Sequence, residues 1–562
     1  MLWQKLLPAW IFPFLRHPRS ALTDIHAGLM MAVLVIPQSL GYATLAGLPP
    51  VMGLYTAIAP TLVYAYLGSS SVNAVGPVAI TAIMTSGALS AYGLSSTQYA
   101  QMAITLALMV GVLLWVASWF RLGWIMQFVS RGVATGFISG AAVLIVLSQL
   151  KHLFGAPIIG DSLLSIANNL THTAQWLHPT TALLGGVSFV LLMVNKYQPK
   201  WLWGCLPSRY MTFGKRFFIV ICVLLGSLLV KQLTLDTRTL GALPTHFPLP
   251  SLPILHFHVI AQLLPSALLI ALIAFISSAT IAGNFARLRQ EPFSNNKELQ
   301  ALGLANIASG LFGGFAVAGG VSRTSLNVSI GANSPLASVI CPLGVLVILL
   351  YLGEYLSHLP YAILAAIIAS SVVSMVDITT FKNAWQHDKA EALNFATTFV
   401  VCVVFGLNAG LVAGLLMSFA GVIYRSHHAH VAVLGQIGNS DHFRNILRHS
   451  AKTFDNLILI RIDESLYFGN VATIKDKIHQ IHASYPNATD MVLVMTAVNH
   501  VDLSAQEMLS ALNKTLMDNQ QRLHFSEIKG PVMDVLKQTT LFDELSGQTF
   551  LSTAIAVNTL KK

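Results

Sequence analysis

The sequence predicts an all-α polytopic membrane domain followed by a smaller α/β domain at its C-terminal end. The chain of 562 residues is 54% hydrophobic and only 10% charged, whereas soluble domains carry about 25% charged residues. Apolar runs long enough to span a bilayer fill residues 24–425. Near residue 430 charged residues become frequent and the apolar runs shorten. The formal net charge of +10 does not indicate a nucleic-acid partner, because most basic residues fall between the apolar runs.

The apolar region divides into about 14 predicted spans, in two halves of about seven spans each. The spans are 24–46, 51–67, 77–93, 98–119, 126–150, 179–194, 216–232, 261–284, 296–315, 321–336, 337–353, 357–376, 391–406 and 408–425. Those at 77–93 and 321–336 are short and interrupted by glycine and proline. We therefore expect neither of them to cross the bilayer alone.

The charges between the spans predict the orientation of the chain. The segment 195–216 contains five Lys or Arg residues and no acidic residue, so the positive-inside rule places it in the cytoplasm. The loops near 151–178 and 233–260 are poor in Lys and Arg, and we expect them outside. No cleavable signal peptide is recognisable. The sequence thus predicts a multi-pass protein of the inner (plasma) membrane with both termini in the cytoplasm.

The C-terminal part has the sequence pattern of a compact α/β domain. The runs 457–462 and 491–496 are apolar and strand-like, and each precedes a segment with helical spacing. Alternating strands and helices are typical of an α/β sheet. The chain is therefore expected to have three parts: a cytoplasmic N-terminal segment 1–23, a transmembrane domain 24–428 and a cytoplasmic domain 429–562.

Arg323 is the most informative residue of the membrane region. It is the only Lys or Arg that the predicted spans place near mid-membrane. An ionised side chain deep in hydrocarbon costs about 2.5–3.5 kcal/mol on insertion scales, so it is usually retained for function. Glycines precede Arg323 and a helical stretch follows it. A broken membrane helix would thereby present a guanidinium and a positive helix N-terminus to a bound anion.

Two segments at matching places in the halves, 71–87 and 316–331, share this layout. Each has small or glycine residues followed by a short, helix-compatible run rich in Ser and Thr. Interrupted spans at corresponding positions indicate the binding site of a secondary transporter. An odd number of spans per half inverts one half relative to the other, so the two helix N-termini would face each other near the midplane. Their unpaired N–H groups and partial positive charges suit an anion.

The first span adds a third wall to this site. Pro37 breaks the helix and frees a carbonyl group, and Gln38 and Tyr42 lie on one face. Gln38 can supply amide donors to a ligand. A kinked span with a buried tyrosine is more often explained by packing, so that alternative stays open.

Several motifs along the chain together resemble the sulfate permease (SulP) family of anion transporters. They are DIHAGLMMAVLVIPQSLGYATLAGLPPVMGLYTA at the start, VGPVAITAIM in the third span, NKELQALGLANIASGLFGGFAVAGGVSRTSLN through the ninth and tenth spans, and LYFGN in the C-terminal part. The resemblance implies seven plus seven spans in an inverted repeat, with a core domain that moves against a gate domain. It also implies a cytoplasmic STAS domain (sulfate transporter and anti-sigma antagonist type) and a homodimer.

The resemblance also implies which residues bind the anion. Carried over position by position, the family's site corresponds to residues of the first, third and tenth spans: Gln38, Tyr42, Val78, Ala79, Ile80, Val321, Ser322, Arg323 and Thr324. Backbone N–H groups contribute much of the binding in this family. Side-chain identities in the third span therefore say little about the substrate.

The eighth span departs from the family pattern at the position linked to coupling ions. Many members carry an acidic residue there, followed by serine, whereas this chain has Ser277 and Ser278. A serine neither carries a proton at physiological pH nor offers a formal charge to sodium. We therefore expect no proton coupling through this span. Anion exchange, uniport and sodium held by neutral oxygens are the alternatives.

A second departure lies in the C-terminal domain. Signalling relatives of STAS domains carry Asp-Ser and phosphorylate the serine, but here Leu503 follows Asp502, and Ser504 stands one place late. Asp502 is instead expected to cap the helix that begins after it, because a short polar acceptor suits a helix start. A cytoplasmic protein partner of the STAS domain stays open.

These observations predict a secondary active transporter of a small inorganic anion, with sulfate first and bicarbonate or chloride next. Its expected partners are the anion and the lipid bilayer. The alternatives are a dicarboxylate transporter, a nucleobase permease of the same architecture and a STAS-linked membrane sensor. The acidic ring-binding residues of nucleobase carriers and the Asp-Ser switch of sensors are both missing. No nucleotide loop, metal cluster or nucleophile motif is recognisable, so we expect no enzymatic activity, cofactor or metal.

Overall fold

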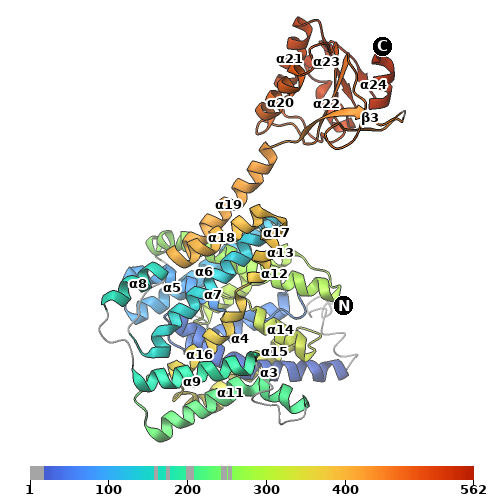
Figure 1. Cartoon of the computed structure of the whole chain (residues 1–562). Helices are drawn as coiled ribbons and strands as arrows, with labels where there is room; N and C mark the ends of the chain where they lie inside the picture. The colour runs from blue at the N-terminus through green and yellow to red at the C-terminus, as the bar shows by residue number, and fades with distance from the viewer. Residues whose placement is uncertain are drawn as a thin grey trace. The chain divides into compact units, whose positions relative to one another are not determined.

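The computed structural model of the protein describes residues 18–128, 130–156, 162–172, 178–197, 208–241, 250, 253, 256–438 and 440–561. The chain divides into two compact units, Met1–Ser418 and Phe419–Lys562 (Figure 1). The first unit is helical, and the second contains a mixed sheet with helices. The predicted fold class is thereby confirmed, whereas the bounds 1–23, 24–428 and 429–562 stay predictions.

A helix overlaps each predicted span. The helices are α3 (Pro18–Leu45), α4 (Val51–Leu67), α5 (Ala79–Leu89), α6 (Ser96–Trp119), α7 (Arg131–Phe154), α9 (Pro179–Tyr197), α11 (Ser208–Leu233), α12 (Phe257–Arg289), α13 (Asn295–Leu311), α14 (Val321–Ile330), α15 (Leu336–Leu356), α16 (Tyr361–Val372), α18 (Lys389–Phe405) and α19 (Leu407–His427). Two more, α8 (Leu163–His172) and α17 (Ile378–His387), are short and amphipathic. Within the described residues, seven membrane segments are long and apolar enough to cross a bilayer. The number of crossings and the inverted repeat therefore stay predictions.

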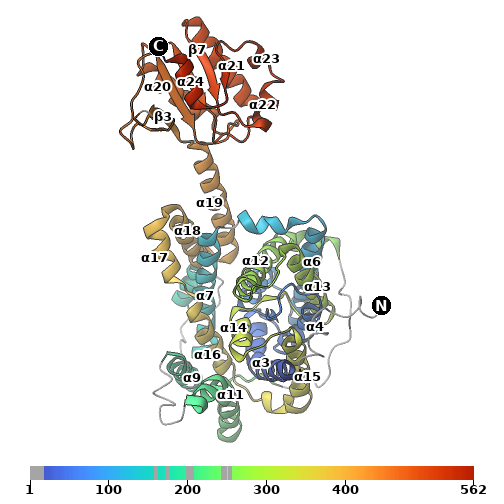
Figure 2. The same ribbon diagram turned by 90° about the vertical axis from the view of Figure 1, so that its right-hand side faces the viewer.

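The membrane helices pack into two groups, which Figure 2 shows side by side. In the core group, α13 packs against α4 and α6, and α15 packs against α3 and α4. In the gate group, α7 packs against α9, α16 and α18. The core group also includes α5, α12 and α14, and the gate group includes α11 and α17. We name the groups after the core and gate domains that the sequence predicts.

Glycine lets the helices of the core group approach closely. A Cβ atom added at Gly303 in α13 would lie 2.7 Å from the backbone nitrogen of Trp115 in α6. One added at Gly111 in α6 would lie 2.6 Å from the backbone nitrogen of Ile307. Small residues at such crossings let membrane helices gain packing energy that longer side chains would prevent. The interrupted helices of the core group are thus held by a closely packed frame.

The second unit is built on a six-stranded sheet in the order β4-β3-β5-β6-β7-β8. Strands β5 to β8 are parallel, whereas β3 pairs antiparallel with β4 and β5. The strands are β3 (Val431–Gln436), β4 (Phe443–Asn445), β5 (Leu457–Ile462), β6 (Asp490–Val494), β7 (Arg522–Ser526) and β8 (Thr549–Phe550). The helices are α20 (Val471–Ala483), α21 (Leu503–Asp518), α22 (Gly530–Leu536), α23 (Thr540–Asp543) and α24 (Thr553–Leu560).

The strand and helix predictions for this unit are confirmed. β5 coincides with the predicted strand 457–462, and β6 begins one residue before the predicted start at 491. Every residue of β6 is buried, because apolar clusters cover both faces of the sheet. Asp502 caps α21 as predicted: its Oδ1 accepts a hydrogen bond of 2.9 Å from the N–H group of Ala505.

Candidate functional site

The two interrupted segments predicted from the sequence meet inside the core group. Strand β1 (Val75–Gly76) pairs antiparallel with β2 (Ala318–Gly319). A backbone hydrogen bond of 3.1 Å from Gly320 N to Ala74 O extends this pairing. Since β1 leads into α5 and β2 leads into α14, the pairing brings the N-terminal ends of two helices together.

Neither helix end has a side-chain cap. Val78 precedes α5 and Gly320 precedes α14, and neither accepts a capping hydrogen bond through its side chain. The first intrahelical bonds come from the N–H groups of Ala82 and Thr324. The three N–H groups before each of these have no intrahelical acceptor, and each helix end carries about half a positive charge. Both properties suit a small anion.

Arg323 lies beside both helix ends. The residue is only 6% exposed, and its Nη2 donates a hydrogen bond of 2.8 Å to Pro77 O, just before α5. A Cβ atom at Gly76 would lie 2.7 Å from Nη1, and one at Gly320 would lie 2.8 Å from Nε. The glycines before the two helices therefore leave the space that the guanidinium occupies.

Arg323 and Gln38 line one cavity between the core and gate groups. The cavity has a volume of about 520 Å³. The core group contributes Gln38 from α3 and Arg323 from α14, and the gate group contributes Lys196 from α9 and Ser370 from α16. A ligand in this cavity would therefore touch both groups of helices.

The other predicted residues of the first and third spans lie close to Arg323. Tyr42 is buried and is an electrostatic neighbour of the guanidinium. Val78 is partly exposed at the start of α5, and Ala79 and Ile80 are buried behind it. Their contribution to an anion would come from backbone N–H groups, and their assignment as ligands stays a prediction.

In the tenth span, Val321 and Ser322 form the start of α14, and Val321 is 46% exposed. Thr324 is fully buried, and its hydroxyl is engaged within the protein. Its Oγ1 donates to Asn73 Oδ1 at 3.2 Å and accepts from Ala74 N–H at 3.1 Å. Thr324 therefore ties α14 to the segment before β1, and its assignment as an anion ligand stays a prediction.

Lys196 is a candidate that the sequence analysis missed. The sequence predicts that the sixth span ends at 194 and that Lys196 is a loop charge, but α9 continues to Tyr197. The Lys196 Nζ donates hydrogen bonds to Ser370 O at 2.6 Å and to Ser374 Oγ at 2.9 Å. A long basic side chain near a helix end can lie along apolar surface and still present its charge to water. A second cation thus lines the cavity of Arg323.

Glu298 is a second residue that the sequence analysis missed, although it lies in the motif that begins with NKELQALGLAN. It is 0% exposed and lies in the first turn of α13. Its carboxylate accepts hydrogen bonds from Tyr64 Oη at 2.8 and 2.9 Å, from Ser278 Oγ at 2.6 Å, from Asn73 Nδ2 at 3.3 Å and from the Ser69 hydroxyl. These neutral donors come from the segment 64–73 and from α12. Glu298 therefore joins three parts of the core group.

The serines at the expected coupling position have different surroundings. Ser278 is buried and donates to Glu298, so a carboxylate from α13 reaches this position although α12 supplies none. The Ser277 hydroxyl lies 3.5 Å from the carbonyl oxygen of Gly319, just before α14. No group of three or more His, Cys, Asp and Glu side chains within the described ranges could hold a metal ion.

Comparison with known proteins identifies the family. Residues 22–398 match the sulfate permease family, and residues 449–556 match the STAS domain. The chain belongs to the sulfate permease family. Membership supports a membrane-embedded transporter of anions, and the relatives of this chain are transporters rather than enzymes.

Two curated relatives cover most of this chain. It is 32% identical over 505 residues to "Sulfate transporter 4.1, chloroplastic" of Arabidopsis thaliana, which covers 87% of this chain and 72% of that protein. It is 28% identical over 547 residues to "Probable sulfate transporter Rv1739c" of Mycobacterium tuberculosis (strain ATCC 25618 / H37Rv), covering 96% and 95% of the two chains.

Solved structures share the fold. The murine Solute Carrier 26 family member A9 anion transporter, in its inward-facing state, aligns with a TM-score of 0.83 at 21% identity and covers 96% of this chain and 91% of that one. The transmembrane domain of the cyanobacterial bicarbonate transporter BicA aligns with a TM-score of 0.61 at 21% identity, covering 72% and 98%.

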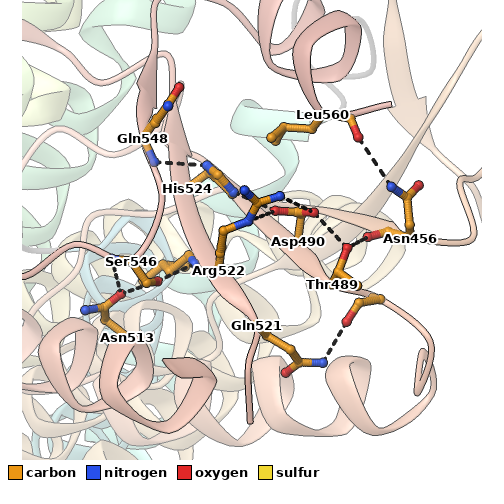
Figure 3. Close-up of polar contacts among 12 residues, drawn as sticks. Asn456, Thr489, Asp490, Asn513, Gln521, Arg522, His524, Ser546, Gln548 and Leu560 are labelled. Carbon is orange, nitrogen blue, oxygen red and sulfur yellow. Dashed lines mark hydrogen bonds and ion pairs between the residues drawn. The ribbon is translucent and has the colours of Figure 1, made fainter. Parts of the chain in front are cut away.

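The STAS domain contains a polar cluster on β6 and β7, in which Asp490 and His524 are buried (Figure 3). Asp490, 2% exposed, accepts hydrogen bonds from Arg522 Nε at 2.8 Å and from His524 Nε2 at 2.9 Å. The other ring nitrogen of His524, Nδ1, accepts a hydrogen bond of 3.0 Å from Gln548 N–H. Because one ring nitrogen donates and the other accepts, the neutral form of His524 fits this site.

This cluster lowers the pKa of two side chains, His524 and Asp490. Burial lowers the pKa of His524 below its usual 6.5, and Asp490 only partly offsets that effect. Burial alone would raise the pKa of Asp490, but hydrogen bonds from Arg522, His524 and Thr489 lower it below its usual 3.8. Both folded-state pKa values therefore lie below those of the unfolded chain.

We expect acid to weaken the STAS domain in two stages. As pH falls below about 6.5, the unfolded chain binds a proton at His524 that the folded domain resists, so stability falls. Below about pH 4, protonation of Asp490 in the unfolded chain removes more stability. Hydrogen exchange of β7 in the full-length protein, corrected for intrinsic rates, should show the first stage. His524→Gln should lose this first stage, whereas a variant of the exposed His449 should keep it. Equal protection of wild-type β7 at pH 7.5 and 5.5 would contradict the assignment of the first stage to His524.

Proposed function

We propose that this protein is a secondary active transporter of a small inorganic anion, with sulfate as the first candidate. The observation that carries the proposal is the position of Arg323. Its guanidinium lies beside two uncapped helix N-termini and lines a cavity bounded by both helix groups. A buried cation together with unpaired N–H groups stabilises an anion in a site with little water.

The same cavity supports a mechanism of alternating access. The core group carries Gln38 and Arg323, whereas the gate group carries Lys196 and the serines of α16. Movement of one group against the other would expose the anion first to one side of the membrane and then to the other. Lys196 precedes a strongly basic segment, which the positive-inside rule places in the cytoplasm. The cavity is therefore the cytoplasmic approach, and Lys196 attracts the anion there.

The choice of sulfate rests on the named relatives from Arabidopsis and Mycobacterium. Bicarbonate, chloride and small dicarboxylates are the alternatives, because anion size is selected by small differences in packing around the helix ends. A nucleobase permease would need acidic residues in the eighth and tenth spans, where this chain has Ser277 and Arg323. We also propose a homodimer in the inner (plasma) membrane with cytoplasmic termini, and the STAS domain is the part available to a cytoplasmic partner.

Flux measurements in proteoliposomes test the proposed function. Purified full-length protein should take up labelled sulfate, and a panel of bicarbonate, chloride and dicarboxylates as competitors should rank the substrates. Imposed proton, sodium and anion gradients then separate symport from exchange and uniport. Absence of uptake of every anion in the panel, by protein that is folded and inserted, would refute anion transport.

Ser277 gives the sharpest prediction about coupling. Wild-type anion binding should depend little on pH, because α12 contributes no carboxylate at this position. In Ser277→Glu a carboxylate would form beside the start of α14. When this carboxylate is ionised, it would pair with Arg323 and compete with the anion. When it is protonated, it would no longer pair with Arg323, and the anion could bind. Anion affinity of this variant should therefore rise as pH falls, in contrast to the wild type.

Ser277→Gln is the matched control, because it has the same size and does not titrate. Its affinity should show no pH dependence beyond that of the anion itself. Wild-type protein that accumulates anion against a gradient, driven by protons alone, would refute the proposed lack of proton coupling. Glu298, whose carboxylate reaches Ser278, would then be the next candidate for the proton carrier, followed by Asp377, Asp388 and Glu391.

A further inference from the structure

A second cavity lies entirely within the gate group. Its volume is about 610 Å³. The end of α7 contributes Lys151 and His152, the start of α9 contributes Thr181, and the start of α16 contributes Tyr361. The segment after α11 contributes Asp236, Thr237 and Arg238. None of the described residues that line this cavity belongs to the core group, so the cavity is separate from the proposed transport site.

The two cavities lie at opposite ends of the same helices. Thr181 near the start of α9 lines the second cavity, and Lys196 at its end lines the cavity of Arg323. A helix of 19 residues is about 28 Å long, close to the thickness of the hydrocarbon core. In α16, likewise, Tyr361 lines the second cavity and Ser370 lines the first. The second cavity therefore opens at the opposite membrane face.

The cations of the second cavity have no partners within the described parts of the chain. Neither the Lys151 ammonium nor the Arg238 guanidinium makes a hydrogen bond or an ion pair there. Both are electrostatic neighbours of His152, whose ring stacks on Tyr361 at 5.4 Å. Lys151 is partly buried, and an ammonium removed from water without a partner is costly. A bound anion would supply the missing partner.

Two further features favour an oxyanion. The Thr237 hydroxyl is buried and has no hydrogen-bond partner among the described residues, so it remains available as a donor. The acid that lines the cavity, Asp236, is 98% exposed and lies 3.6 Å from His178 Nε2, so water screens much of its charge. A lysine, an arginine and a hydroxyl together match a group that has several oxygen atoms.

We propose that this cavity is a second anion site, which binds an oxyanion at the membrane face opposite to the Arg323 cavity. The recognised group is an oxyanion carried either by a free ion, such as sulfate, or by the phosphate of a lipid headgroup. The site consists of gate-group residues only. An occupied site would therefore act on the gate group without entering the proposed transport site.

Equilibrium sulfate binding to full-length protein in phosphatidylcholine nanodiscs at low ionic strength tests this proposal. Wild-type protein should show two classes of saturable site, and Arg323→Ala should weaken one of them by roughly 10- to 150-fold and leave the other unchanged. Adding Lys151→Gln and Arg238→Gln to Arg323→Ala should weaken the remaining class by at least about tenfold. Lys231→Gln, a charge removal near the end of α11, is the matched control and should leave that class unchanged.

Nanodiscs that contain phosphatidylglycerol distinguish the two sources of the oxyanion. Weaker sulfate binding at the second class in those nanodiscs would identify a lipid phosphate as the competitor, and equal binding would identify a free ion as the occupant. Loss of all saturable binding in Arg323→Ala, or a residual class unaffected by Lys151→Gln and Arg238→Gln, would refute the second site. If Arg323→Ala keeps both classes while Lys151→Gln and Arg238→Gln remove one, the proposed transport site fails and the second site stands.

Discussion

Arg323→Ala will weaken anion binding by roughly 10- to 150-fold, because it removes a charge-assisted hydrogen bond worth about 1.5–3 kcal/mol. The side chain is 6% exposed and lies at the meeting point of α5 and α14. The predicted spans place no other Lys or Arg near mid-membrane. The helix N-termini remain in the variant, so residual weak binding is expected rather than complete loss.

The measurement is sulfate affinity of purified protein, with transport kinetics in proteoliposomes. Arg323→Lys should recover only part of the loss, because a point charge does not reproduce the planar guanidinium and its hydrogen bond to Pro77 O. Arg287→Ala is the matched control, since Arg287 is exposed and bonds only Asn284 among the contacts described. An unchanged KM in Arg323→Ala would show that the anion binds elsewhere.

Glu298→Ala should strongly destabilise the first unit. The carboxylate is fully buried and receives hydrogen bonds from Tyr64, Ser69, Asn73 and Ser278. Its removal leaves these donors unsatisfied, at about 1–3 kcal/mol for each group that finds no new partner. Several kcal/mol is a large part of the total stability of most proteins, about 5–15 kcal/mol. The apparent unfolding temperature of the full-length protein should therefore fall by more than about 5 °C.

Glu291→Ala provides the control for this prediction. Glu291 bonds Ser71 and Arg289, but its side chain is 28% exposed and its partners can turn to water. This variant should cost clearly less than Glu298→Ala. Ser278→Ala should also cost less, since it removes one donor and leaves the carboxylate with three. An unfolding temperature unchanged in Glu298→Ala would show that the donors find other partners and that Glu298 does not hold the core group together.

The general architecture was readable from composition and periodicity. Charge is scarce between residues 24 and 425 because lipid does not tolerate it, so the apolar runs mark the helices with small errors at their ends. The strands of the STAS domain were equally clear, and Asp502 was assigned correctly as a helix cap. These features depend on neighbouring residues in the chain, and a linear pattern is sufficient to find them.

Arg323 could be singled out for the same reason, since an isolated buried cation in a membrane segment is costly wherever the rest of the chain lies. The partners of Glu298 and Lys196 could not be found in this way. Glu298 in α13 accepts hydrogen bonds from Tyr64 in α4 and Ser278 in α12, and Lys196 in α9 donates one to Ser374, just after α16. Hydrogen bonds and cavities form between side chains that packing brings together. A local sequence pattern does not say which distant segments will lie side by side. For the same reason, the second cavity with Lys151 and Arg238 became visible only once the ends of α7, α9 and α16 were placed beside one another.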